Sequence, residues 1–436
     1  MRLESKIVPH KWQMECLNAW ILNDCRGIVK AATGTGKSLV ALMAMEYLSR
    51  NGENAKFAII VPTKALQEQW RKNLIDIFGI SGNLISLHGG GRSSNAGSLN
   101  NFFHLYTANT ARDKFCSHCK IWKEKVFLIA DECHRYGSED NSRIFNARYE
   151  YSLGLSATPE RYGDFGFEEK ILPGLGKLVF EYGYDRAADD NVISPFRLTN
   201  IAVELTYPEK VEYENMSKKL SLLINNLYNR YPFLRKQRNF FACLEKIRRD
   251  KAEQEMQPDT DIEQFFNISI NRKTLLNRAG NRMSSLIHIL KSLYGKAKII
   301  VFHELIEELD FISGALERSG IPHLAYHSGM KSGERDTALE TFRNGSSKIL
   351  LACKALDEGL DVPDTHVGII VAASKTARQR IQRIGRTIRK SSGKDFSWII
   401  TLFAKDTIEE KFYSLENEQK LFGSARIEYL NNGFAI

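Results

Sequence analysis

Two series of short apolar runs, each followed by a segment long enough for a helix, dominate the sequence. The runs of the first series are residues 27–31, 57–61, 84–87, 126–130 and 151–155. The runs of the second series are residues 298–302, 323–327, 348–353, 367–372 and 396–403. Apolar strands that alternate with helices are typical of parallel sheets covered by helices on both faces. The pattern predicts an α/β fold with two parallel-sheet lobes.

The segment between the two series, residues 207–291, has a different pattern. It is long, helix-like and rich in Lys and Arg, with acidic residues grouped near its middle. A solvated helical linker explains this composition, and so does a helical insertion whose basic face contacts a phosphate backbone; we favour the second interpretation. The predicted domains are therefore a first lobe (1–206), a basic helical segment (207–291) and a second lobe (292–436). The second lobe is expected to end in one helix from Thr407 to about Leu421, stopped at Gly423.

A glycine-rich loop, residues 31–38 with the sequence AATGTGKS, directly follows the first apolar run and precedes a helical segment. Backbone N–H groups of such a loop surround phosphates, and the helix N-terminus adds the positive end of its dipole. Lys37 is expected to reach the β- and γ-phosphates, and the Ser38 hydroxyl to bind Mg²⁺. Ala31 stands where the usual pattern begins with Gly. The other predicted nucleotide-binding residues of the loop are Thr33, Gly34, Thr35 and Gly36.

Two carboxylates, Asp131 and Glu132, end the apolar run at 126–130. Asp131 is placed to hold Mg²⁺, and Glu132 to accept a proton from the attacking water. A lone Asp-Glu pair is often only an acidic strand end. Here a phosphate-binding loop precedes it in the same alternating pattern, and both motifs end strands of one parallel sheet. They are therefore expected to face one crevice.

Charge and cysteine content set further expectations. The formal net charge of +9 favours an anionic partner. The charged N-terminus lacks a secretory signal and no run is long enough to cross a membrane, so we expect a cytoplasmic protein with reduced cysteines. Cys116 and Cys119 have the spacing of half a zinc site, but no second Cys-x-x-Cys pair completes it. We favour an exposed turn with incidental thiols over a zinc site.

The phosphate loop and the Asp-Glu-Cys-His tetrad at 131–134 together resemble superfamily 2 of the helicases, from about residue 8 to residue 403. This resemblance implies two RecA-like lobes and assigns roles in the first one. Gln13 would contact the adenine. Pro62, Thr63 and Thr107 would touch a nucleic-acid backbone. Ser156 and Thr158, in the run LSATP, would couple hydrolysis to movement of the lobes.

The resemblance continues through the second lobe. His327, in the run HSGM, belongs to a segment that leads into a helix beside the nucleic acid. Gly359 and Asp361 would line the nucleotide cleft. In the run QRIGRTIR, Gln382 opens the motif and takes part in coupling. Arg386 and Arg389 would act as arginine fingers that stabilise charge on the transferring phosphate.

The resemblance thus implies an enzyme that uses ATP and Mg²⁺ and moves along nucleic acid. The tetrad, Gln382 and the run at 357–361 are more similar to type III restriction subunits and XPB translocases than to Asp-Glu-Ala-Asp RNA helicases. That similarity favours duplex or branched DNA as partner over RNA. Two alternatives remain. One is an RNA helicase with the same two ATP-hydrolysing lobes, and the other is a nucleotide-gated binding module without productive ATP turnover.

Overall fold

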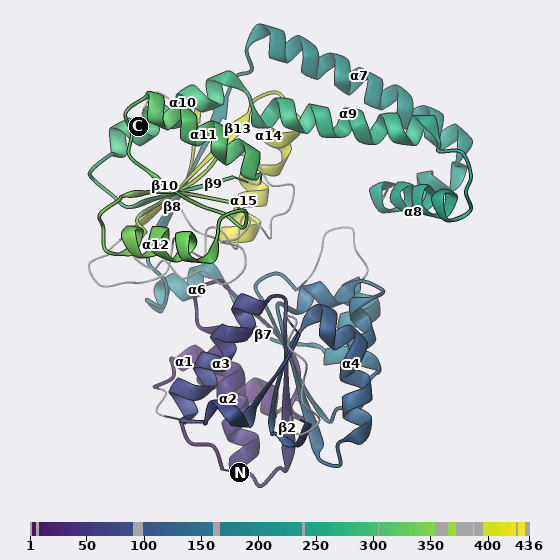
Figure 1. The fold of residues 1–436 in the computed structure, drawn as a ribbon, viewed down its shortest axis with the longest axis vertical. Coiled ribbons are helices and arrows are strands. Elements are labelled where there is room, and N and C mark those ends of the chain that lie inside the picture. The colour runs from purple at the N-terminus through teal and green to yellow at the C-terminus, as the bar shows by residue number, and fades with distance from the viewer. Residues whose placement is uncertain are drawn as a thin grey trace.

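The computed structural model describes residues 2–5, 8–89, 99–159, 166–237, 240–303, 305–353, 365–371, 387, 396–423 and 426–431. Two seven-stranded sheets form the framework of the chain. All strand pairs in both sheets are parallel. Figure 1 shows one lobe around each sheet, with the short helix α6 (Tyr184–Asp189) between them. The predicted fold of two RecA-like parallel-sheet lobes is confirmed.

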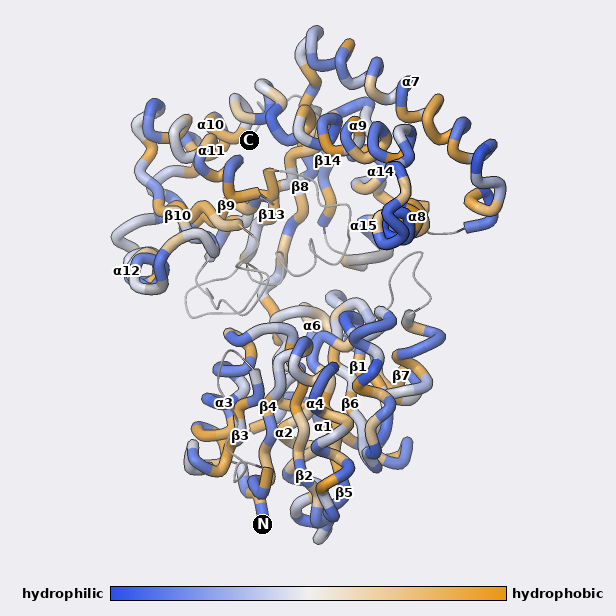
Figure 2. The backbone as a smooth tube through the Cα atoms, turned by 45° about the vertical axis from the view of Figure 1, so that its right-hand side comes forward, coloured by the Kyte–Doolittle hydropathy of each residue, from blue (hydrophilic) through white to orange (hydrophobic). Residues whose placement is uncertain are grey.

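The first sheet has the strand order β3-β4-β2-β5-β6-β1-β7. Its strands are β1 (Arg26–Ala31), β2 (Ala55–Val61), β3 (Ile85–His88), β4 (Phe103–Thr107), β5 (Lys125–Asp131), β6 (Tyr151–Ser156) and β7 (Leu178–Tyr182). Every residue of β2 is buried, as expected of a central strand covered on both faces. The tube in Figure 2 is correspondingly hydrophobic along the inner strands.

Helices cover both faces of the first sheet. One face packs against α1 (Lys11–Ile21), α2 (Lys37–Arg50) and α3 (Lys64–Phe78). The other packs against α4 (Ala108–Ile121), α5 (Leu172–Leu175) and three short helical segments: η3 (Cys133–Gly137), η4 (Asn141–Asn146) and η5 (Phe167–Ile171). A further short segment, η1 (Gly82–Leu84), precedes β3.

The second sheet has the strand order β10-β11-β9-β12-β13-β8-β14. Its strands are β8 (Phe196–Val203), β9 (Ile299–Phe302), β10 (Leu324–Tyr326), β11 (Ile349–Ala352), β12 (Val367–Ile370), β13 (Ser397–Ala404) and β14 (Arg426–Asn431). One face packs against α10 (Gly280–Leu293) and α11 (Ile306–Arg318). The other packs against α12 (Ser332–Arg343) and Phe422 of α15 (Leu415–Phe422).

The position of β8 changes the predicted domain boundaries. This strand precedes residue 206 and was expected in the first lobe, yet it pairs with β13 and β14 in the second sheet. Helix α10, expected in the helical segment, packs on the second sheet through Leu286, Ile289 and Leu290. The chain therefore enters the second lobe before its helical segment. The connection between lobes is the stretch that contains α6.

The helical segment forms an arm inserted between β8 and α10. It consists of α7 (Tyr207–Arg230), η6 (Pro232–Lys236), α8 (Phe240–Glu253) and α9 (Thr260–Asn277). In Figure 1, α7 and α9 lie side by side and α8 lies at the far end of the arm. A small core of its own, which includes Leu227, Leu244 and Phe265, holds the arm together.

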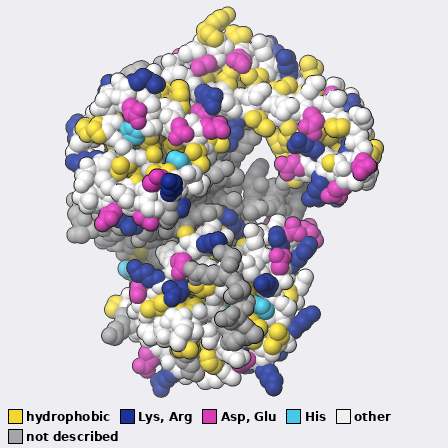
Figure 3. Space-filling model, in the orientation of Figure 1, with side chains coloured by type: hydrophobic (Ala, Val, Ile, Leu, Met, Phe, Trp, Pro, Cys, Tyr) yellow, Lys and Arg dark blue, Asp and Glu magenta, His cyan; other side chains and the backbone are white. Residues whose placement is uncertain are grey.

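The charge of the arm is nearly balanced, which bears on its predicted contact with phosphates. Residues 207–277 contain thirteen basic and ten acidic residues. Arg230 bonds the buried Asp259 and Asp261, and Arg248 bonds Glu263. Figure 3 shows basic and acidic side chains interspersed over the arm. The contact with a phosphate backbone stays a prediction, since part of the expected basic face is used inside the arm.

The C-terminal segment differs from the single helix that was predicted. Two helices occupy it, α14 (Ile408–Phe412) and α15, separated at Tyr413 and Ser414. The break places the Tyr413 ring against Phe403 of β13, with 5.5 Å between ring centroids. Gly423 then ends α15 in a left-handed conformation, and β14 follows. Among the helices that the structure describes, none combines the length and the apolar character of a membrane span.

Candidate nucleotide-binding site

The predicted residues of the first lobe gather at the carboxyl edge of its sheet. Parallel strands end at the same edge, so the residues that follow them meet there. The register makes this explicit: Lys30 pairs with Ser156, and Asp131 pairs with Leu155. On the other side of β5, the last residue of β2 pairs with Thr107 of β4. The phosphate loop, the two carboxylates and the predicted nucleic-acid contacts thus share one edge.

The phosphate loop connects β1 to α2 in the expected manner. Gly34 and Gly36 both have a φ of +85°, a left-handed conformation that strongly favours glycine. The Thr35 hydroxyl donates to the Ala32 carbonyl at 2.7 Å, which closes the loop. No side chain caps the N-terminus of α2 at Gly36 in the described structure. The first N–H groups of α2 are therefore suited to an anion such as a phosphate.

Lys37 is half-buried at the start of α2, close to the backbone of its own loop. Its ammonium group donates to the Ala31 and Ala32 carbonyls at 3.0 and 3.2 Å. These bonds hold the positive charge beside the loop, where phosphates would lie. The position is consistent with the predicted role of Lys37, and Ser38 follows it in the first turn of α2.

Gln13 makes two contacts at the start of α1. Its side-chain oxygen accepts from the His10 amide at 2.9 Å, and its side-chain nitrogen donates to the Gly36 carbonyl at 3.2 Å. The residue therefore touches the backbone of the phosphate loop directly. Its predicted contact with adenine stays a prediction.

Asp131 ends β5 as a buried carboxylate with two donors. Its Oδ2 accepts from the Trp70 indole at 2.8 Å, and its Oδ1 accepts from the Glu132 amide at 3.0 Å. Burial raises the pKa of Asp131, while the Trp70 bond and the charge of Lys37 act in the opposite direction. A carboxylate in this position and a serine hydroxyl are oxygen ligands of the kind that Mg²⁺ prefers. Asp131 and Ser38 therefore fit the predicted metal site.

Glu132 has an unusual backbone conformation for a residue with a side chain. Its φ is +49° and its ψ +51°. Such strain clusters at functional sites, where it fixes the direction of a side chain. One carboxylate oxygen lies 3.4 Å from Nδ1 of the buried His134. This arrangement suits the role of general base predicted for Glu132.

His134 connects the carboxylates to the end of β6. Its Nδ1 lies 2.9 Å from the hydroxyl of Ser156, and that hydroxyl accepts from the Thr158 amide at 3.1 Å. Ser156 and Thr158, the two predicted coupling residues of this lobe, are thereby joined to the tetrad. Sequence reasoning assigned no separate role to His134 or Trp70.

The predicted nucleic-acid contacts lie beside each other at the ends of β2 and β4. Thr63 caps α3 by accepting from the Leu66 amide at 3.4 Å, and Pro62 precedes it. Thr107 lies at the start of α4, with its hydroxyl 3.1 Å from that of Thr110. The buried Gln67 of α3 donates to the His88 and Leu105 carbonyls, so α3 is fastened to β3 and β4. Contact of these residues with nucleic acid stays a prediction.

The second lobe contributes less to the described site. His327 follows β10 and is half-buried, and its Nδ1 has no hydrogen-bond partner within the described part of the chain. The remaining predicted residues of this lobe lie outside the described residues: Gly359, Asp361, Gln382, Arg386 and Arg389. Thr387, between the two arginines, is described and buried.

The prediction of an exposed turn at Cys116 and Cys119 was wrong. Both residues lie in helix α4, where Cys119 is buried and Cys116 donates to the Arg143 carbonyl at 3.2 Å. His118 packs inward and bonds the hydroxyl of Tyr106. Within the described ranges, no group of three or more His, Cys, Asp or Glu residues could hold a metal ion. The apolar side of α4 explains the burial, since it covers one face of the first sheet.

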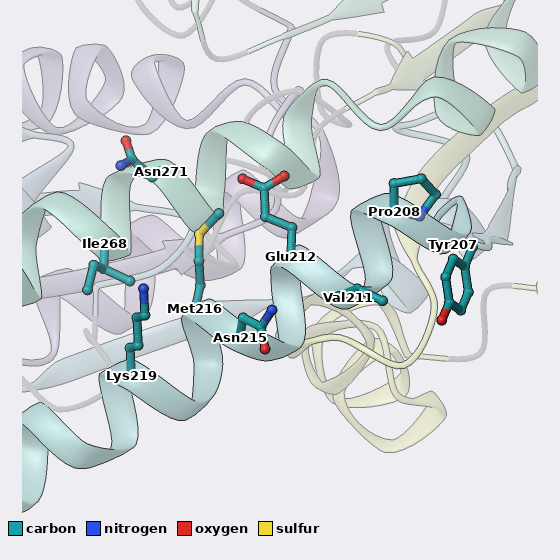
Figure 4. A pocket seen from close by; sticks show the side chains of 9 residues that line it. All are labelled: Tyr207, Pro208, Val211, Glu212, Asn215, Met216, Lys219, Ile268 and Asn271. Atoms are coloured by element: carbon teal, nitrogen blue, oxygen red, sulfur yellow. The ribbon is translucent and has the colours of Figure 1, made fainter.

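A groove of about 700 Å³ lies elsewhere, between α7 and α9 of the arm. Figure 4 shows that α7 lines most of it, with Ile268 and Asn271 contributed by α9. Tyr207 at one end is 82% exposed. None of the predicted site residues lines this groove.

Comparison with known proteins agrees with this geometry. Residues 6–161 match the family described as type III restriction enzyme, res subunit, and residues 281–391 match the helicase conserved C-terminal domain. The chain belongs to superfamily 2 of the helicases. It is accordingly an ATP-hydrolysing enzyme.

Individual relatives give the extent of the similarity. The chain is 29% identical to the DNA 3'-5' translocase XPB2 of Sulfurisphaera tokodaii, over 89% of this chain and 80% of the relative. It is 35% identical to the probable ATP-dependent RNA helicase ddx49 of Dictyostelium discoideum, but over only 26% of this chain and 22% of the relative. The fold is also similar to the Hef helicase domain of Pyrococcus furiosus, with a TM-score of 0.57, 22% identity and coverage of 93% and 97% of the two chains.

Proposed function

We propose that this superfamily 2 enzyme couples ATP hydrolysis to movement along DNA, with duplex or branched DNA as its track. The observation that carries the proposal is the shared edge of the first sheet. Lys37 begins α2 after β1, and Asp131 ends β5. Thr63 follows β2, the strand next to β5, and Thr107 ends β4, the strand after that. A nucleotide site and a nucleic-acid contact on one rigid edge allow the state of one to influence the other.

Hydrolysis requires groups that hold the phosphates, bind the metal and activate water. In this proposal the α2 N-terminus and Lys37 bind the phosphates, while Ser38 and Asp131 hold Mg²⁺. Bound Mg²⁺ neutralises charge on the β- and γ-phosphates. Glu132 takes the proton from the attacking water, and its strained backbone fixes the carboxylate in one direction.

The second lobe completes the site. By family analogy, Gly359 and Asp361 line the cleft, and Arg386 and Arg389 reach the γ-phosphate when the lobes close. ATP then favours the closed state because only that state adds the arginine contacts. Loss of the γ-phosphate removes these contacts, so the lobes separate again. Each ATP cycle changes how strongly the two lobes bind the nucleic-acid backbone. The second lobe binds it through His327, and the first lobe through Pro62, Thr63 and Thr107.

Two links inside the first lobe support coupling of the nucleotide to the track. Trp70 joins Asp131 to α3, the helix that Thr63 caps. His134 joins the tetrad to Ser156 at the start of the LSATP run. Gln382 would extend this coupling to the second lobe. A change around the γ-phosphate can thus reach Thr63 through the Trp70 hydrogen bond and the LSATP run through the His134 hydrogen bond.

Similarity over most of the chain to a protein named as a DNA translocase favours DNA. RNA is the second candidate, because one protein named as an RNA helicase matches a quarter of the chain at 35% identity, and another, from Methanocaldococcus jannaschii, matches 88% of it at 22% identity. We place the protein in the cytoplasm, as its sequence predicts.

The test is steady-state ATP hydrolysis with duplex, forked, branched and single-stranded DNA and with RNA of equal length. We expect duplex or branched DNA to increase turnover most, with a stimulation that falls as salt rises. Stimulation by RNA alone would favour the second candidate. No stimulation by any nucleic acid would overturn the proposal, and binding of ATP without phosphate release would establish the binding module instead.

A further inference from the structure

Tyr184 lies where the two lobes meet. It begins α6, between β7 of the first sheet and β8 of the second, and only 7% of its surface is exposed. Its ring packs against Phe196 of β8 and Phe422 of α15, with centroid distances of 5.9 and 5.4 Å. The rings of Phe196 and Phe422 are also 6.3 Å apart. Both partners belong to the second lobe, so the position of the tyrosine ring depends on that lobe.

The hydroxyl of the same residue reaches the phosphate loop of the first lobe. It lies 2.8 Å from the Thr33 hydroxyl, and the Thr33 amide donates to it at 3.5 Å. Burial raises the pKa of Tyr184 to about 12, so the hydroxyl stays protonated at neutral pH. It therefore can both donate to and accept from Thr33. One side chain thus contacts the phosphate loop and the second lobe.

Helix α6 is fastened on both sides of this contact. On the first-lobe side, Arg186 forms an ion pair with Glu15 of α1, the helix that carries Gln13. On the second-lobe side, a Cβ atom added at Gly423 would lie 1.8 Å from Oδ2 of Asp185. The C-terminus of α15 therefore touches α6 closely. Because this contact is close, a small displacement of α15 toward α6 would also move α6.

We infer that Tyr184 is a positioning residue that sets the conformation of the phosphate loop according to the position of α15 in the second lobe. This inference rests on the proposed function and deepens it. Movement of the second lobe thus affects the nucleotide site at Thr33, in the phosphate loop. This effect is separate from that of Arg386 and Arg389, which would approach the γ-phosphate from the second lobe. Tyr184 itself takes no part in bond breaking.

The first test compares Tyr184→Phe with Tyr182→Phe. Tyr184→Phe keeps the ring and removes the hydroxyl from Thr33. Tyr182→Phe removes a hydroxyl two residues away that donates to Asp190 at 2.9 Å and does not contact the loop. We expect Tyr184→Phe to raise the dissociation constant for Mg·ATP and the KM for ATP by about 2- to 10-fold, the effect of one hydrogen bond, with kcat within about twofold. The control should retain wild-type values, and equal values for both variants would overturn the inference.

The second test asks whether the second lobe acts through this tyrosine. Phe422→Leu keeps an apolar side chain on α15 but loosens its contact with the Tyr184 ring. It should weaken ATP binding about 2- to 5-fold in the wild type. In the Tyr184→Phe background it should have no further effect, because the link is already broken. Multiplicative effects in the double variant would overturn transmission through Tyr184.

These measurements separate the inference from the proposed function. ATP binding, followed with a fluorescent ATP analogue, needs no nucleic acid. If no nucleic acid stimulates ATP hydrolysis by the wild-type enzyme, the proposed function is overturned. The measured ATP affinities would still decide the role of Tyr184. If DNA stimulates the wild-type ATPase but Tyr184→Phe binds ATP as tightly as the wild type, only the inference about Tyr184 is overturned, and the proposed function stands.

Discussion

Glu132 occupies a strained, left-handed position at the end of β5, beside Asp131 and His134. Glu132 is the predicted general base, and a single substitution at this position tests that role. Glu132→Gln keeps the size of the side chain and removes the proton acceptor. We expect ATP binding within about threefold of wild type and turnover lower by about 10²- to 10⁴-fold. Turnover is measured as phosphate release at saturating ATP.

Glu139→Gln is the matched control, because Glu139 is exposed and its carboxylate forms a long ion pair, 3.7 Å, with Lys170. It should hydrolyse ATP at the wild-type rate. Wild-type turnover in Glu132→Gln would remove Glu132 from the mechanism.

Trp70 supports the carboxylate that is expected to hold Mg²⁺. Trp70→Phe removes the indole donor from Asp131, and the pKa of that carboxyl rises further because this bond is one that lowers it. Groups that hold a metal ligand in place commonly affect metal affinity by about 10- to 100-fold. We expect at least about a 10-fold higher Mg²⁺ concentration for half-maximal ATPase activity.

Trp20→Phe is the control for general loss of packing. Trp20 is also buried, and its indole donates to the Ser152 carbonyl at 2.8 Å, away from Asp131. Equal Mg²⁺ dependence in the two variants would show that Trp70 acts only through packing.

Residues differ in how far the sequence reveals them. Lys37, Ser38, Asp131 and Glu132 follow apolar strands, and parallel strands bring such positions to one edge. Trp70 and Tyr184 have no such signal. Their partners lie 61 and 151 residues away in the chain. Such contacts depend on how the helices pack against the sheet, and the periodicity of apolar residues in the sequence does not specify this packing.

At the scale of elements, β8 shows why the domain boundary was misplaced. Its sequence, FRLTNIAV, contains Thr199 and Asn200, which read as polar but are buried in the second sheet. Trp398 of β13 donates to the Thr199 hydroxyl at 2.7 Å, so a neighbouring strand satisfies this group. The arm was recognisable as helical from its composition. Its insertion after β8 was not, because sheet order is a long-range property.

The edge formed by β3 and β4 carries a pair of buried histidines. Nε2 of His88 lies 3.1 Å from Nδ1 of His104, and the His88 ring stacks on Tyr106. Burial lowers the pKa of both histidines to about 3, and the nearby cations Lys114 and Lys56 act in the same direction. Both side chains are therefore neutral in the folded protein at pH 5.

This pair predicts acid sensitivity of the first lobe. The unfolded chain binds protons at these histidines below about pH 6.5 and the folded chain does not, so stability is lost as pH falls. At pH 5 the loss is about 2 kcal/mol for each histidine relative to pH 7. His88→Phe keeps the stacked ring and should roughly halve this loss in urea unfolding followed by tryptophan fluorescence. An unchanged loss between pH 7 and pH 5 would contradict the assignment.

At the scale of the whole molecule, the two sheets, α6 and the arm determine what the enzyme can do. One continuous apolar core extends from α1 and α2 through Tyr184 and Phe196 to the second sheet. The lobes are thus joined by packing as well as by the chain. The sequence predicted both lobes because their apolar strands are continuous, whereas the α6 junction combines residues from three separate segments.

The central claim is that the ATP site is divided between the lobes, with Lys37 and Glu132 on one and Arg386 on the other. Phosphate release by Arg386→Ala, at saturating Mg·ATP and duplex DNA, tests it most directly. Arg318→Ala, at the exposed end of α11, is the control. We predict ATP binding close to wild type and release slower by about 10³-fold or more in Arg386→Ala, as for arginine fingers in general. Release at the wild-type rate would contradict the divided site.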